Sequence, residues 1–139
     1  MIVSMYSSKY TYSKKEKLCS RRVITSLFEN GKTFFSEPFR VLWLKSEEVI
    51  PFPALTGISV GKKSFPRAVD RNRVKRLIRE AWRVNKHHLY GQLEQINMQL
   101  VIMIIYSGDK IPGYNELKEQ MQETVRKFSL HLKTVTENK

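Results

Sequence analysis

The stretch that decides the fold is RAVDRNRVKRLIREAWRVNKHH, residues 67–88. Its apolar side chains recur at helical spacing and form one stripe, made of Val74, Leu77, Ile78, Ala81 and Trp82. That spacing predicts an amphipathic helix whose stripe packs on a core. Polar and basic side chains occupy the opposite side, at Asn72, Arg76, Arg79 and Arg83. The helix therefore needs a core on one side and presents cations on the other.

The segments around this helix predict both helices and strands. Upstream, a short helix is expected from Ser20, as the N-cap, to Asn30, with Gly31 as a left-handed stop. Strands are expected at 33–35, 39–44 and 55–60. Downstream, 98–106 predicts a strand covered on both faces, because it is apolar without alternation, and 114–132 predicts a last helix. The order helix, three strands, helix, strand, helix indicates an α+β fold, a single-domain sandwich.

Length and composition limit the possible classes of protein. A chain of 139 residues, of which 41% are hydrophobic, is expected to form one domain, here 14–132, with short tails at 1–13 and 133–139. No apolar run approaches the roughly twenty residues of a membrane helix, and no secretory signal is apparent. The single cysteine, Cys19, cannot form an internal disulfide. A cytoplasmic protein is expected.

The net charge of +12 is concentrated in two segments. Residues 62–86 hold ten basic and two acidic side chains, and residues 9–22 hold six basic and one acidic. Such an excess favours a polyanionic partner, nucleic acid before anionic membrane. The alternative is a solvated helix face, but such a face normally mixes signs, because like charges one turn apart repel. Nucleic-acid binding is the favoured interpretation.

No hydrolytic or metal site is expected in the chain itself. His87 and His88 are adjacent, so their side chains point apart on a helix, and no acidic or cysteine cluster accompanies them. Asp70 and Glu80 are ten residues apart, which is about 15 Å along a helix. Trp82 lies on the apolar stripe and is expected in the core rather than as a stacking platform.

Residues 65–80, FPRAVDRNRVKRLIRE, closely resemble a signature of the bacterial ribonuclease P protein family. That signature joins Ala-Val, Arg-Asn-Arg and Lys-Arg-x-x-Arg-Glu in one helix. Residues 57–63, GISVGKK, are similar to the family's preceding strand, which ends in Ser-Val-x-Lys-Lys. Residues 27–31, LFENG, resemble the family's Val-Phe-x-x-Gly helix end. The resemblance extends over about 14–132.

The resemblance implies a fold and a division of labour. The fold is ribosomal-protein-S5-domain-2-like, with a left-handed β-α-β crossover. A large RNA subunit carries the catalysis and uses Mg²⁺, removing the 5′ leader of precursor tRNA as an endonuclease. The protein binds that RNA and holds the leader in a cleft, with no catalytic residue, no tightly bound metal, no membrane contact and no oligomer expected. The alternative function is a non-enzymatic structural RNA-binding protein of the ribosomal type.

The resemblance also implies site residues, carried over position by position. In the signature helix, the RNA-binding residues are Arg71, Asn72, Arg73, Lys75, Arg76 and Arg79. The supporting basic residues are Lys62, Lys63, Arg67 and Arg83. The residues implied for the leader cleft are Ile24, Phe28, Arg40, Leu42 and Ser59.

Two of these cleft positions, Ile24 and Leu42, are often aromatic in the family. Base stacking in this chain would therefore depend more on Phe28. Two alternatives stay open from the sequence. A one-residue slip in the alignment with the family would assign the cleft to the face of Phe39, Val41 and Trp43 instead of that of Arg40 and Leu42. Phe28 would be a core residue if its helix face were buried.

Overall fold

The computed structural model describes residue 12 and residues 14–137. The predicted N-terminal tail, 1–13, lies outside the described residues except for Tyr12. The elements in chain order are η2 (Lys14–Glu16, a 3₁₀ helix), α1 (Arg21–Asn30), β1 (Lys32–Ser36), β2 (Phe39–Lys45), β3 (Ala54–Val60), α2 (Ala68–Gln95), β4 (Leu100–Tyr106) and α3 (Tyr114–Glu137). The predicted α+β fold and its element order are confirmed. No helix formed by these residues is long and apolar enough to span a membrane.

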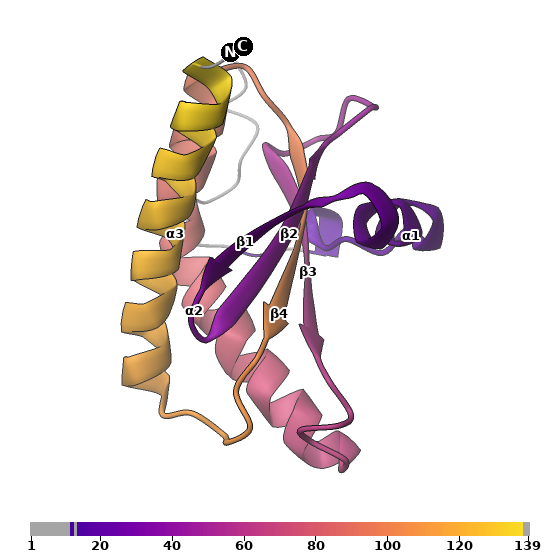
Figure 1. Ribbon diagram of the computed structural model, residues 1–139, viewed down its shortest axis with the longest axis vertical. Helices are drawn as coiled ribbons and strands as arrows, with labels where there is room; N and C mark the ends of the chain where they lie inside the picture. The colour runs from indigo at the N-terminus through magenta and orange to yellow at the C-terminus, as the bar shows by residue number, and fades with distance from the viewer. Residues whose placement is uncertain (1–11, 13, 138–139) are drawn as a thin grey trace.

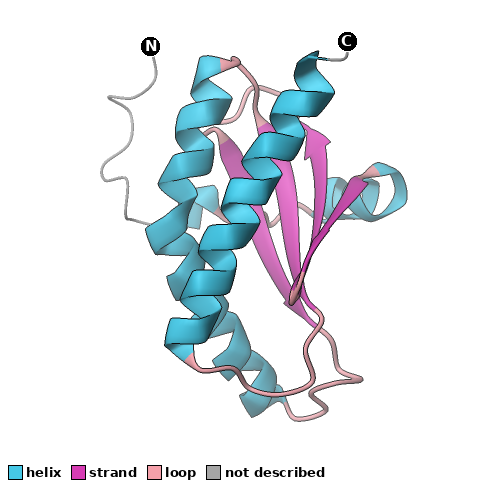
Figure 2. Cartoon of the chain, turned by 60° about the vertical axis from the view of Figure 1, so that its left-hand side comes forward, coloured by secondary structure: helices cyan, strands magenta, loops and turns pink. Residues whose placement is uncertain are grey.

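The strands form one mixed sheet in the order β1-β2-β4-β3. The β1–β2 and β2–β4 pairs are antiparallel, and β3 and β4 are parallel. The parallel pair is joined through α2, which makes the β-α-β unit; its implied left-handedness stays a prediction. Helices α2 and α3 lie on one face of the sheet and α1 lies on the other (Figures 1 and 2). The last strand, β4, is therefore central, between β2 and β3.

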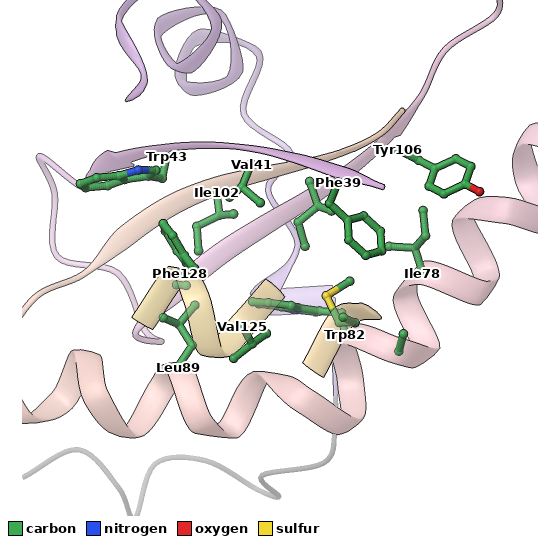
Figure 3. Close-up of a cluster of buried hydrophobic side chains, with 14 of the residues drawn as sticks. Phe39, Val41, Trp43, Ile78, Trp82, Leu89, Ile102, Tyr106, Val125 and Phe128 are labelled. Atoms are coloured by element: carbon green, nitrogen blue, oxygen red, sulfur yellow. The ribbon is translucent and has the colours of Figure 1, made fainter. Parts of the chain in front are cut away.

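The main core fills the space between the sheet and the α2–α3 pair. Phe39, Val41 and Trp43 project from alternate positions of β2 into this layer and are almost fully buried. They meet the predicted helical stripes, with Trp82 from α2 and Phe128 from α3 facing the strands (Figure 3). Burying such large side chains stabilises a fold by about 1.5–3 kcal/mol each. Trp82 is a core residue, as predicted.

A second, smaller cluster covers the other face of the sheet. It consists of Leu18, Leu27, Leu42, Val101 and Met103. Leu27 comes from α1 and Val101 and Met103 from β4, so α1 packs directly on the central strand. The strand predicted at 98–106 is present as Leu100–Tyr106 and is buried on both faces except at Ile105, which is half-buried.

The start of α1 follows the prediction and its end does not. Ser20 is the N-cap, and its hydroxyl accepts a hydrogen bond from the Val23 N–H at 3.4 Å. Gly31 is not a left-handed stop, because its φ of −68° and ψ of 152° are extended. Glycine is required there by a close approach instead: a Cβ on Gly31 would collide with the carbonyl oxygen of Leu27.

Helix α2 continues well beyond the predicted end at His88. Leu89 and Leu93 extend its buried stripe, so burial continues past the histidines. The helix stops at Asn97, which adopts a φ of 53°. The Asn97 N–H donates to the Glu94 carbonyl at 3.2 Å, and the Met98 N–H donates to that of Leu93 at 2.9 Å. This is a Schellman ending with asparagine in the usual glycine position.

The predicted C-terminal tail, 133–139, is helical over most of its length. Helix α3 continues past Leu132 to Glu137. Leu132 is buried, Lys133 and Thr134 are exposed, and Val135 is half-buried against the main core. The helix therefore continues past its predicted end at Leu132, and its apolar side still contacts the core at Val135.

A buried ion pair fixes the segment before α1 to the body of the protein. Lys86 on α2 donates a hydrogen bond to Glu16 on η2, and the side chains of both residues are 2% exposed. The Tyr90 hydroxyl donates to the same carboxylate at 2.8 Å. Burial lowers the pKa of Lys86, and the hydrogen bond to Glu16 opposes that shift. Nearby, the Tyr12 hydroxyl donates to the Thr56 carbonyl of β3 at 2.5 Å.

Replacing Lys86 with Ala should lower the free energy of unfolding by about 3–5 kcal/mol, because the buried Glu16 carboxylate loses its counter-charge. The double variant Glu16→Leu with Lys86→Met should recover most of that loss, since an apolar pair of similar size removes both charges. Urea unfolding of the three proteins measures this. Lys133→Ala, on the exposed side of α3, is the control. A Lys86→Ala cost no larger than the control's would contradict a buried pair.

Candidate nucleic-acid interface

The first turns of α2 form a cationic surface. They project beyond the end of the sheet at which β3 finishes (Figure 1). Of the predicted residues, Lys62, Lys63, Asn72, Arg73 and Arg76 are exposed, and Lys75 and Arg79 are half-buried. We call these seven residues the α2 cationic surface. Within residues 14–137, none of its six cations lies in an ion pair with a carboxylate.

The other three predicted basic residues have protein partners. The Arg71 guanidinium donates hydrogen bonds to the carbonyls of Phe65 and Pro66, at 2.8 and 2.9 Å. Arg71 therefore fastens the loop before α2 to the helix itself. Arg67 lies 3.8 Å from the carboxylate of Asp70.

Arg83 is paired in a similar way. Its guanidinium lies 2.6 Å from the carboxylate of Glu80, one turn earlier on α2. The hydrogen bond from Arg83 lowers the pKa of Glu80. The cations of the α2 cationic surface lack such partners among the described residues, apart from a hydrogen bond that the Arg79 Nε donates to the Lys75 carbonyl, one turn earlier, at 3.4 Å.

A row of four side chains crosses the sheet on the face that carries α1. Strand register places Phe35 opposite Arg40, Arg40 opposite Ile105, and Ile105 opposite Ser59. Directly opposite residues project from the same face of a sheet. We call Phe35, Arg40, Ile105 and Ser59 the open row, because Phe35 is 70% exposed and the other three are half-buried. Arg40 and Ser59 were predicted to lie together, and Phe35 and Ile105 were missed.

The register also decides which face of β2 belongs to this surface. Phe39, Val41 and Trp43 are buried in the main core on the opposite face. Arg40 and Leu42 project from the other face, which carries α1. Leu42 itself is 4% exposed beneath α1, so it supports this surface from below.

The two predicted α1 residues lie on one side of that helix. Ile24 is half-buried and packs on the second cluster, as does Ile105 of the open row. Phe28, one turn later, is 50% exposed. The alternative that Phe28 is a core residue is therefore wrong. Its ring is accessible on the side of α1 that Ile24 shares.

Arg40 has an unsatisfied donor within the open row. Its Nε is buried and has no hydrogen-bond partner among the described residues. A buried polar group without a partner costs about 1–3 kcal/mol. An anionic or carbonyl-bearing ligand on the open row would offset this cost. Proteins that bind single-stranded nucleic acid commonly use exposed aromatic rings to stack on bases and nearby cations to contact the backbone.

A cavity of about 430 Å³ lies on the other side of α1. Arg22, Val23 and Ser26 line it, together with Leu44 of β2 and Leu55 of β3. On a helix, Arg22 and Ser26 point away from Ile24 and Phe28. None of the five predicted cleft residues lines this cavity.

The described part of the chain offers no site for metal chemistry. No three of its His, Cys, Asp and Glu side chains gather where they could hold a metal ion. The prediction that the His87 and His88 side chains point apart is wrong, because their ring centroids lie 4.0 Å apart, with the ring planes inclined by 39°.

Comparisons with known proteins agree with this geometry. The family model for ribonuclease P matches residues 12–130. The chain is 40% identical over 114 residues to the ribonuclease P protein component of Porphyromonas gingivalis strain W83, covering 81% of this chain and 82% of that protein. It is 31% identical over 127 residues to the corresponding protein of Chlorobium phaeobacteroides, covering 84% and 87%.

Two solved structures share the fold. The RNase P protein from Thermotoga maritima superposes with a TM-score of 0.61 at 26% identity, covering 80% of this chain and 96% of that chain. The Staphylococcus aureus RNase P protein superposes with a TM-score of 0.63 at 24% identity, covering 82% and 94%.

Arg71→Ala should lower the free energy of unfolding by about 1.5–3 kcal/mol, because the loop carbonyls lose hydrogen bonds from a charged donor. Arg73→Ala, two residues away on the exposed side, should change it by less than about 0.5 kcal/mol. Chemical denaturation of both variants measures the difference. Equal stability of the two would mean that Arg71 does not hold the loop.

Proposed function

The chain belongs to the ribonuclease P protein family, and from this premise we propose that its two surfaces divide the work of the protein subunit. The α2 cationic surface binds the RNA subunit of the holoenzyme, and the open row with Phe28 binds the 5′ leader of precursor tRNA. The protein assists endonucleolytic removal of the leader, and catalysis resides in the RNA. The family match favours this function over a structural protein of the ribosomal type.

The absence of ion pairs in the α2 cationic surface is the observation that carries the proposal. Six cations converge on one helix end and the adjoining loop, and none has a carboxylate partner among the described residues. Self-repulsion of this kind destabilises a folded protein unless a polyanion neutralises it. An RNA backbone does so and releases its counterions on binding.

The leader assignment is supported by exposure and by the strand register. Phe28 offers an accessible ring on α1, and the open row offers Arg40 and Ser59 on the adjoining sheet face. Rings bind bases with little sequence preference, because every base has a π-face. A leader of variable sequence requires such a surface.

We propose that the RNA subunit binds the Mg²⁺ ions that the reaction uses. The described His, Cys, Asp and Glu side chains do not form a group that fits a Mg²⁺ ion, and the proposed surfaces are cationic, which disfavours a divalent cation. The protein contributes binding and orientation only. We place this work in the bacterial cytoplasm, where precursor tRNA is processed.

Binding to the RNA subunit should depend strongly on salt. If the α2 cationic surface neutralises about six phosphates, log K against log salt should have a slope of about −4 to −5, using roughly −0.7 to −0.9 per phosphate. Arg76→Ala with Arg79→Ala should make the slope shallower by about 1.4–1.8. Filter binding over a salt series measures this.

The matched control for this pair is Lys118→Ala with Lys133→Ala, two exposed cations on α3. It removes the same charge from another face and should leave the slope close to the unmodified protein's. Melting temperatures of both double variants check that folding is intact. Equal slopes for the two double variants would show that net charge, not the α2 cationic surface, governs binding.

Phe28→Ala should weaken holoenzyme binding of precursor tRNA by roughly fivefold to a hundredfold, since one stacked base is worth about 1–3 kcal/mol. Binding of mature tRNA should stay unchanged, because it has no leader. The melting temperature should change little, because the Phe28 ring is 50% exposed. Equal weakening for both tRNA forms would refute a leader contact at Phe28.

A further inference from the structure

We propose that Phe35, with Arg40 beside it, is a second stacking site for a leader nucleotide, at the end of the open row farthest from the α2 cationic surface. This inference rests on the proposed function, because it extends the leader path beyond Phe28. The base lies on the Phe35 ring, and the adjoining phosphate meets the Arg40 guanidinium. Only a leader that is long enough to cross the sheet reaches this site.

The contrast between two consecutive phenylalanines is the first support. Phe34 turns into the core, where its ring lies 5.6 Å from that of Phe128 and 5.1 Å from that of His131. Phe35 points to the opposite face and is 70% exposed. Thr33, the other residue of this edge strand (Lys32–Ser36) on the same face, is polar and exposed. The fold therefore does not need an aromatic ring at Phe35.

Single exposed apolar residues are common and carry no meaning alone, so the neighbour of Phe35 is the second support. Arg40 stands directly opposite Phe35 in the β1–β2 register, where Cβ atoms are about 4.5–5.5 Å apart. Its Nε is buried without a hydrogen-bond partner among the described residues. A ring beside an unsatisfied cation matches a nucleotide, which has both a π-face and a phosphate.

The position of Phe35 in the sheet sets the order along the leader. The open row runs from β1, one edge of the sheet, to β3, the other edge. With strands about 4.8 Å apart, it is about 14 Å long. Its Ser59 end adjoins Lys62 and Lys63, which belong to the surface proposed for the RNA subunit. A leader that starts beside that RNA reaches Phe35 last.

The test is a leader-length series bound to reconstituted holoenzyme. Phe35→Ala should weaken binding of precursor tRNA with a long leader by roughly fivefold to a hundredfold. It should not affect precursor tRNA with a leader of one or two nucleotides, or mature tRNA. Phe35→Leu, which keeps an apolar side chain without a π-face, should behave like Phe35→Ala, and Phe35→Trp should keep most of the affinity.

Control variants distinguish the loss of a stacking contact at Phe35 from a loss of folding and from a failure of the proposed function. Leu130→Ala removes an apolar side chain of similar exposure on α3 and should bind all substrates normally. If Phe28→Ala distinguishes precursor from mature tRNA and Phe35→Ala does not, the inference fails and the proposed function stands. If neither variant distinguishes them, the leader assignment itself fails.

Two further outcomes would also overturn the inference. An equal loss for short and long leaders would place Phe35 near the cleavage site rather than at the far end of the row. A protein dimer in sedimentation that Phe35→Ala converts to monomer would show that the exposed ring serves contact between two copies of the chain.

Discussion

The central strand β4 is apolar on both faces, and the rest of the structure follows from the need to cover it. Helices α2 and α3 cover one face completely, and α1 covers the other only in part. Helix α1 has ten residues and is about 15 Å long, so it buries Leu42 and Met103 and leaves the next row of side chains uncovered. The surface that we propose for the leader is thus the part of the sheet that the fold leaves open.

Helix α2 is exposed and cationic in its first turns and carries a buried ion pair in its later turns. Its first turns hold cations without carboxylate partners, and its later turns hold Lys86 in a buried pair with Glu16. Counting charges along 62–86 treats Lys86 as part of the cationic cluster, although it is neutralised inside the protein. The cations without carboxylate partners are therefore concentrated nearer the start of the helix than the sequence indicates.

Periodicity predicted the elements well, because helix and strand patterns record one-sided burial directly. It failed where local chemistry decides: at Gly31, where a close approach rather than a left-handed turn requires glycine, and at Asn97, which ends α2 in place of a glycine. The open row joins residues from four strands, so Phe35 and Ile105 emerge only from the register. Arg71 likewise cannot be told from Arg73 by sequence, since only its carbonyl partners differ.

The insertion of β4 between β2 and β3 has a consequence for biosynthesis. Ribosomes deliver the chain from its N-terminus at about 5–20 residues per second, so β2 and β3 emerge well before the strand that joins them. In that interval each has an unpaired edge, which invites association with other nascent chains. Because the open row includes Ile105, the surface proposed for the leader is completed only in the final third of translation. Leader binding at the proposed surface would therefore require that synthesis has passed β4.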